Sequence, residues 1–255
     1  MITELFSFLG LCIGSCLLVY ASYSDVKTRE ISDLVWILMS VFGVFFILAE
    51  LFIGSGSLSL FQLFISLAVG AIFAFLLYFL NFGGADVKAI ISLSVLFPTF
   101  PAFYLSGSLL HLSLSLPITG VPPLNIFVLS TLTNALLIAL SSPISLFLYN
   151  SIKKHFSPLM FLGYKVSISE LNAKKNFKLM HELQIQGHGS GGIEKKYVWG
   201  GVEPTEEVIS CLEELEQKGK LREVWVTPEL PFILYLTAGF FTAAFYGDFI
   251  SALLF

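Results

Sequence analysis

Two aspartates stand at the ends of apolar stretches, where their types and spacing allow acid–base chemistry. Asp25 directly follows the first apolar stretch, and Asp86 opens a later one just after Gly83-Gly84-Ala85. Two carboxyl groups a few ångströms apart resist double ionisation and can share a proton. One can then act as base on a water molecule, while the other protonates a carbonyl or a leaving amine. Such a pair can hydrolyse a peptide bond without a metal ion or a covalent intermediate.

The positions of these aspartates on their helices suggest how the two roles divide. Asp86 stands at the start of a predicted helix, where the helix dipole favours a charged carboxylate, whereas Asp25 stands at a helix end, where it favours the neutral form. We therefore expect Asp86 to be the base and Asp25 the acid. Because the two groups interact, the pair would titrate as a unit.

Six apolar stretches are candidates for the helices that position these residues, since a transmembrane helix needs about 20 apolar residues. Five qualify plainly: 5–21, 34–53, 60–80, 124–149 and 231–255. The sixth, 87–105, is interrupted by Pro98 and Pro101. Its uninterrupted apolar run is only about 10 residues, a length that also suits a re-entrant segment.

The distribution of basic residues favours six crossings. All 14 Lys and Arg residues lie at 27–29, at Lys88 and within 153–222. If 87–105 crosses the membrane, these three places share one side, and the loops of the other side, 54–59 and 106–123, contain none. Cytosolic loops of membrane proteins hold such an excess of Lys and Arg. We therefore predict both termini outside, with Asp25 and Asp86 at the cytosolic face.

A polar insert separates the last apolar stretch from the others. Residues 204–218 are predicted to form a helix and 221–226 a strand, while the Gly-rich 186–192 lacks the Lys-Ser/Thr of a phosphate loop and is predicted to be a turn. The expected fold is an all-α polytopic membrane protein with a small α+β cytosolic insert. Its expected parts are a membrane domain (1–150), the soluble insert (151–229) and a last transmembrane helix (230–255) that packs back on the membrane domain.

Composition argues against several other functions. The net charge of −4 disfavours a nucleic-acid partner. The three cysteines form no C-x-x-C pair, and the chain has no His-Glu-x-x-His motif, so we expect no metal and no cofactor. No acidic residue lies mid-bilayer, where a proton-coupled transporter usually has one. A transporter, or a membrane anchor subunit of an assembly system, stays the alternative to a peptidase.

Three segments resemble the type IV prepilin peptidase family, an intramembrane G-x-G-D aspartic peptidase family, and within it the archaeal preflagellin peptidases. Segment 25–33 (Asp-Val-Lys-Thr-Arg-Glu-Ile-Ser-Asp) is similar to the family segment that begins with the first catalytic Asp. Segment 83–88 (Gly-Gly-Ala-Asp-Val-Lys) resembles the G-x-G-D motif with the second, although Ala85 replaces its second Gly. Segment 224–231 looks like the preflagellin peptidase C-terminal region.

The resemblance implies catalytic roles for Asp25 and Asp86, and a supporting role for the motif residues Gly83, Gly84, Ala85 and Lys88. It implies cleavage of the short basic signal segment of preflagellin or pilin-like precursors at the cytosolic membrane face. The Cys-rich zinc module and methyltransferase role of bacterial members have no counterpart here, so peptidase activity alone is expected. A basic substrate suggests Glu30 and Asp33 as substrate contacts, with the lipid bilayer as the other partner.

Overall fold

A computed structural model describes residues 2–53, 60–80, 82–101, 103–107, 112–174, 176–185 and 193–254. The chain forms two compact units. The first joins Met1–Ala139 with Pro231–Phe255, and the second is Leu140–Leu230. The predicted boundaries of the membrane domain and the insert, at residues 150 and 230, stay predictions.

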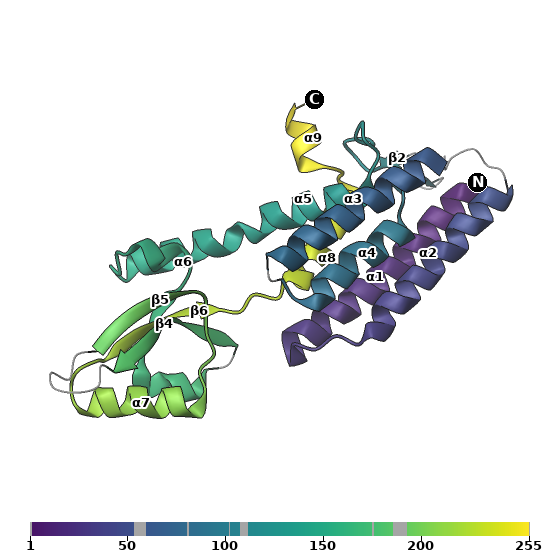
Figure 1. Ribbon diagram of the computed structural model, residues 1–255. Helices are drawn as coiled ribbons and strands as arrows, with labels where there is room; N and C mark the ends of the chain where they lie inside the picture. The colour runs from purple at the N-terminus through teal and green to yellow at the C-terminus, as the bar shows by residue number, and fades with distance from the viewer. Residues whose placement is uncertain are drawn as a thin grey trace. The chain divides into compact units, whose positions relative to one another are not determined.

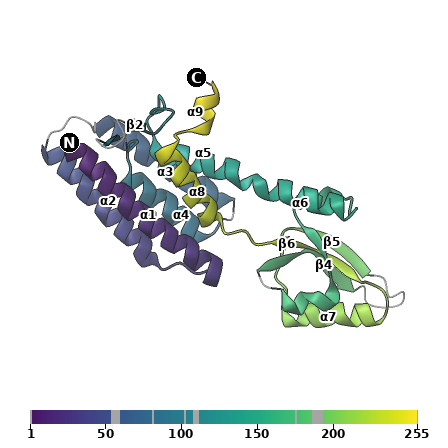
Figure 2. The same cartoon turned by 180° about the vertical axis from the view of Figure 1, so that it is seen from behind.

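The first unit is mainly helical and contains both aspartates. Helices α1 to α4 run side by side in both views (Figures 1 and 2). The elements of this unit are α1 (Ile2–Thr28), α2 (Asp33–Ile53), α3 (Leu60–Phe79), α4 (Gly84–Leu96), β1 (Phe103–Gly107), β2 (Leu112–Leu116), α5 (Phe127–Ala139), α8 (Phe232–Phe245) and α9 (Phe249–Leu254).

Within the described residues, four helical stretches are long and apolar enough to cross a membrane. They are Glu4–Thr28 of α1, α2, α3, and Phe127–Ile152, which contains α5 and α6 (Ser141–Ile152). The apolar helix α8 has 14 residues, which gives about 21 Å at 1.5 Å per residue, less than the roughly 30 Å of a bilayer core. The length and composition of these helices therefore indicate a multi-pass membrane protein. The number of six crossings stays a prediction.

Helix α4 is shorter than the predicted span 87–105. It ends at Leu96, because Pro98 cannot donate a helical N–H and its ring disfavours a helical conformation in the preceding residue. The chain then enters the antiparallel hairpin of β1 and β2, in which Phe103 pairs with Leu116 and Gly107 with Leu112. The alternation Leu-Ser-Leu-Ser-Leu at 112–116 has the period of a strand, a signal that the prediction of a plain loop over 106–123 missed.

Small residues let other helices approach α4 closely. The short helix contacts α1, α2, α3, α5 and α8. A Cβ atom on Gly43 of α2 would lie 2.7 Å from the Leu96 backbone, and one on Gly70 of α3 would lie 1.8 Å from the Ser94 hydroxyl. Gly14 of α1 also lies close to α4, since its Cβ would lie 3.3 Å from Leu96 Cδ2. Packing around α4 therefore fixes the helix that begins at the second aspartate.

The last apolar stretch, 231–255, is broken between α8 and α9 and is not one helix as predicted. Gly247 has a φ of +115°, a conformation that side chains with a Cβ rarely adopt. Asn134 of α5 spans the break, donating from Nδ2 to the Gly247 carbonyl at 2.8 Å and accepting the Phe249 N–H on Oδ1 at 3.1 Å. Asp248 accepts the Ser251 N–H at 2.7 Å and so caps α9. Asn134 therefore links α5 to the break between α8 and α9.

The second unit is a small sheet with one long helix on it. Its four strands have the order β3-β6-β4-β5, with antiparallel pairing throughout. In both views α7 lies along one face of this sheet (Figures 1 and 2), and its buried Leu212 and Leu215 share a core with Leu179 and Val226. The remaining bounds are η1 (Pro158–Phe161), β3 (Tyr164–Ser167), η2 (Ile168–Ala173), β4 (Phe177–Ile185), β5 (Ile193–Val202), α7 (Glu206–Gln217) and β6 (Glu223–Pro228).

The predicted elements of the insert are present with shifted ends. The predicted helix 204–218 contains α7, whose N-cap is Thr205, with its hydroxyl accepting the Val208 N–H. The predicted strand 221–226 overlaps β6, which starts at Glu223. The predicted turn at 186–192 lies outside the described residues.

Candidate active site

Asp86 is held by the turn that precedes it. It lies in the first turn of α4 with only 9% of its surface exposed. Its Oδ2 accepts the backbone N–H of Gly83 at 3.1 Å, while the Gly83 carbonyl accepts the Asp86 N–H at 3.0 Å. The bond to the Asp86 side chain is one of the two bonds of a capping box, in which an acidic residue reaches back to the backbone N–H of the residue before the helix. The carboxyl group therefore has a fixed orientation.

Asp25 lies half-buried in the last turns of α1, the helix that contacts α4. Asp25 stands near the end of α1 and Asp86 in the first turn of α4, and the two carboxyl groups are within the range of electrostatic interaction. The structure therefore places the two carboxyl groups that the sequence singles out on neighbouring helices.

The segment after Asp25 folds back on α1. Arg29 adopts a positive φ of 59°, which ends the helix. The Ser24 hydroxyl donates to the Glu30 carbonyl at 2.7 Å, and the Thr28 hydroxyl donates to the Ser24 carbonyl at 2.9 Å. Glu30 is exposed. These bonds fix the backbone path from the first aspartate to α2.

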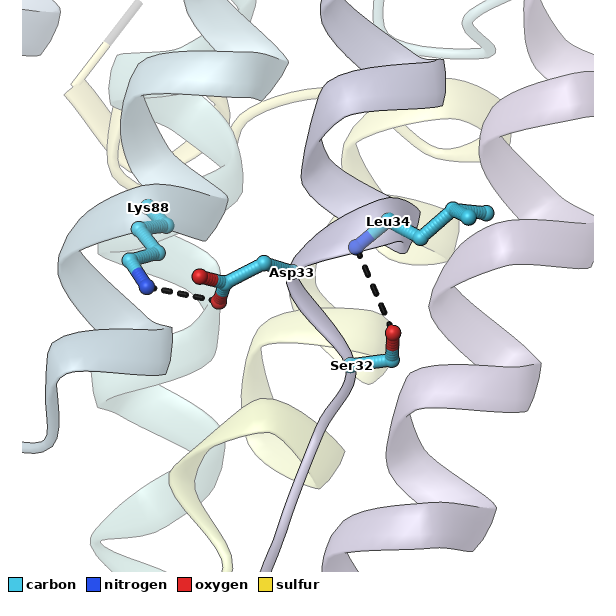
Figure 3. A network of polar contacts seen from close by, with 4 residues as sticks. All are labelled: Ser32, Asp33, Leu34 and Lys88. Carbon is cyan, nitrogen blue, oxygen red and sulfur yellow. Dashed lines mark hydrogen bonds and ion pairs between the residues drawn. The ribbon is translucent and has the colours of Figure 1, made fainter.

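Asp33 forms an ion pair with Lys88. Figure 3 shows Lys88 of α4 reaching toward Asp33 at the start of α2, with Nζ 2.6 Å from Oδ1. The adjacent Ser32 hydroxyl accepts the Leu34 N–H at 3.4 Å, which orders the first turn of α2 (Figure 3). Because Lys88 follows Asp86 by two residues, the pair links α2 to the turn that holds the second aspartate. A substrate cation at Asp33 would have to share or replace Lys88.

The two glycines of the motif differ in their surroundings. A Cβ atom on Gly83 would lie 3.3 Å from Asp86 Oδ2, whereas one on Gly84 would meet nothing within 4 Å. Ala85, in the position of the motif's second Gly, packs against the hydrophobic core. A side chain at Gly83 would therefore crowd the Asp86 carboxyl group, whereas one at Gly84 would not.

Gly83→Ala is expected to lower any activity that depends on the Asp86 carboxyl group by about tenfold, because the new methyl group displaces that carboxyl group slightly and a displacement of about 1 Å at a reacting group can cost up to a hundredfold. Gly84→Ala is the matched control and is expected to keep activity within about twofold, since its new methyl group has open space. Initial rates on one precursor substrate measure both. Equal rates for the two variants would show that crowding at Asp86 does not matter.

Sequence reasoning missed two further features of this end of the bundle. The buried Ser22 and Thr237 hydroxyls, on α1 and α8, lie 2.7 Å apart. The rings of Phe82 and Phe232 meet edge to face with their centroids 5.1 Å apart. Hydroxyl residues inside apolar helices are a signal for interhelical bonding, but the sequence does not tell which helices meet. Among the described residues, no group of three or more His, Cys, Asp or Glu side chains could hold a metal ion.

Comparison with known proteins places this arrangement in a family. The model of the "Type IV leader peptidase family" matches residues 12–141, which include both aspartates. The model of the "Archaeal Peptidase A24 C-terminus Type II" matches residues 156–249. The chain is 28% identical over 244 residues to a preflagellin peptidase of Methanocaldococcus jannaschii, covering 92% of this chain and 93% of that protein. It is 26% identical over 251 residues to a preflagellin peptidase of Methanococcus maripaludis, covering 92% and 94%. The chain therefore belongs to the type IV leader peptidase family and is a protease.

Proposed function

We propose that the protein is an intramembrane aspartic endopeptidase that removes the short basic signal segment from preflagellin or type IV pilin-like precursors. The proposal draws on relatives that are named preflagellin peptidase and match over 92% of this chain. It also draws on the apolar helices, which suit a substrate whose basic segment is followed by a hydrophobic helix. Cleavage takes place at the cytosolic face, and the excess of basic loop residues on the same side as both aspartates supports this location.

The observation on which the mechanism depends is the placement of Asp25 and Asp86. One carboxyl group comes from the end of α1 and the other from the start of α4, and these two helices contact each other. Two interacting carboxyl groups share one proton more readily than they hold two charges. The pair can therefore present one base and one acid to the same bond.

Hydrolysis then needs only these two groups and water. Asp86 takes a proton from water as the water oxygen adds to the scissile carbonyl carbon, and Asp25 gives its proton to the carbonyl oxygen. The resulting gem-diol intermediate breaks its C–N bond as Asp86 gives its proton to the amine nitrogen and Asp25 takes back a proton from one hydroxyl. A free carboxyl and a free amine result, and both aspartates return to their starting protonation states. The hydrogen bond from Gly83 orients Asp86 for the first step.

Charge at this face suits a basic substrate segment. Acidic residues Asp25, Glu30, Asp33 and Asp86 outnumber the basic residues Lys27, Arg29 and Lys88. Attraction between exposed charges acts over about 8–10 Å at physiological salt, so it guides the segment only when it is close. We propose Glu30 and Asp33 as contacts for it, with Asp33 exchanging Lys88 for a substrate cation.

Cleavage of a precursor in membranes that contain the chain tests this function. Wild type is expected to cut preflagellin or prepilin between the basic segment and the hydrophobic helix, as located by mass spectrometry of both products. The double variant Asp25→Asn/Asp86→Asn, with its insertion confirmed, is the inactive control. Failure of wild type to cut any of several precursors would reject the proposed substrate class.

A further inference from the structure

Helix α8 contacts both helices that hold the aspartates. It packs against α1 and against α4, in addition to its long contact with α5. The close approach to α5 has a structural reason, since a Cβ on Gly239 would lie 2.4 Å from the Thr131 carbonyl. With one side fixed on α5, α8 presents other residues to α1 and to the loop before α4.

The contact with α1 is a buried hydroxyl pair one turn from Asp25. Ser22 Oγ and Thr237 Oγ1 lie 2.7 Å apart, and both residues are only 6% exposed. The Thr237 hydroxyl lies 2.8 Å from the Ile233 carbonyl of its own helix and 3.3 Å from the Leu18 carbonyl of α1, and the Ser22 hydroxyl lies 3.3 Å from the Ile233 carbonyl. Residues three apart share a helix face, so Ser22 and Asp25 lie on neighbouring turns of one face. These bonds fix the height of this part of α1 against α8.

The contact near α4 is an aromatic pair four residues before Asp86. Phe82 meets Phe232, the first residue of α8, edge to face at an angle of 76°. Both rings pack against the hydrophobic core, and the Phe82 N–H donates to the Leu77 carbonyl at 3.0 Å. The loop that positions Asp86 is therefore held between the end of α3 and the start of α8.

We propose that α8 sets the position of Asp25 relative to Asp86, with Thr237, Ser22, Phe232 and Phe82 as positioning residues. This inference rests on the proposed function, in which the two carboxyl groups act together. Acid–base transfer between two groups and one substrate depends on their mutual geometry, and a displacement of about 1 Å can cost up to a hundredfold in rate. The C-terminal region thereby takes part in catalysis without touching the substrate.

Thr237→Val tests the hydroxyl pair, since valine keeps the shape and removes the hydroxyl. In full-length protein the kcat is expected to fall about tenfold or more with KM within about twofold, because geometry of the reacting groups changes and substrate binding does not. Thr237→Ser, which keeps a hydroxyl, is expected to recover most of the kcat. Thr242→Val is the matched control in the same helix, because its hydroxyl donates only within α8, to the Ala238 carbonyl at 2.8 Å.

Two further comparisons separate positioning from general damage. Ser22→Ala/Thr237→Val is expected to be no slower than the slower single variant, since the two hydroxyls act as one pair. Phe232→Leu tests the aromatic contact and keeps the proposal testable should Thr237→Val fail to insert. Its control is Phe245→Leu, at a half-exposed ring that stacks on Phe241 of the same helix. Phe232→Leu alone is expected to lower kcat.

Several results would overturn the positioning role: a Thr237→Val kcat equal to that of Thr242→Val, a change in KM alone, or a Thr237→Ser as slow as Thr237→Val. Asp25→Asn is measured in the same assay. If it stays active, the proposed two-aspartate function fails. If it is inactive while both Thr237→Val and Phe232→Leu match their controls, only the role of α8 fails.

Discussion

Asp86→Asn and Asp25→Asn are each expected to lower the rate of precursor cleavage by about 10²- to 10⁴-fold, the contribution of a positioned acid or base. Asparagine keeps the size of aspartate, and its amide oxygen can still accept the Gly83 N–H at position 86. The fold should therefore survive while the proton transfer is lost. Cleavage rates in membranes, normalised to the inserted protein, measure the effect.

Glu50→Gln is the matched control for these variants. Glu50 is also a partly buried acidic residue of the membrane unit, but it lies in the last turns of α2 rather than in the first turn where Asp33 stands. Its loss is expected to change the rate by less than about twofold, as for most substitutions away from a functional site. If Asp25→Asn or Asp86→Asn keeps full activity, the replaced aspartate only marks the end of its helix. The catalytic pair must then lie elsewhere.

Gly70→Ala is expected to destabilise the protein by about 1–3 kcal/mol, because it overpacks the contact of α3 with α4. The new Cβ would lie 1.8 Å from the Ser94 hydroxyl and 2.7 Å from the Ser94 Cβ. The hydroxyl, which donates to the Ile90 carbonyl at 2.7 Å, can rotate away, but the Cβ cannot. The melting temperature in detergent should fall by about 2–4 °C for each kcal/mol in a chain of this size.

A second substitution at Ser94 tests the cause of this loss. Ser94→Gly removes both nearest atoms, and the next neighbour of the new methyl group is then the Ile90 carbonyl at 3.9 Å. Glycine in a helix costs about 1 kcal/mol by itself, so Ser94→Gly alone is the reference. Gly70→Ala should cost clearly less in that background than in wild type. An equal cost in both backgrounds would show that the α3–α4 contact is not the source.

The sequence by itself determined the family, the protease activity and the multi-pass character of this protein. Membrane spans depend on local composition, which needs no knowledge of neighbours. The motifs at 25–33 and 83–88 can also be recognised locally, because each is a short contiguous segment. The orientation of the Asp86 carboxyl group likewise depends on a neighbour in the sequence, the N–H of Gly83. The expected pairing of Asp25 with Asp86 followed from the motifs, not from the spacing.

Only the tertiary structure decided which side chains bond between the helices around the two aspartates. Lys88 bonds Asp33, and Ser22 bonds Thr237 across 215 residues of sequence. The tertiary structure also revealed the break in the last apolar stretch at Gly247. Asn134, on a different helix, satisfies the backbone groups left by that break. Such partners leave no local signal, because a polar side chain in an apolar helix can be satisfied by any helix that packs beside it.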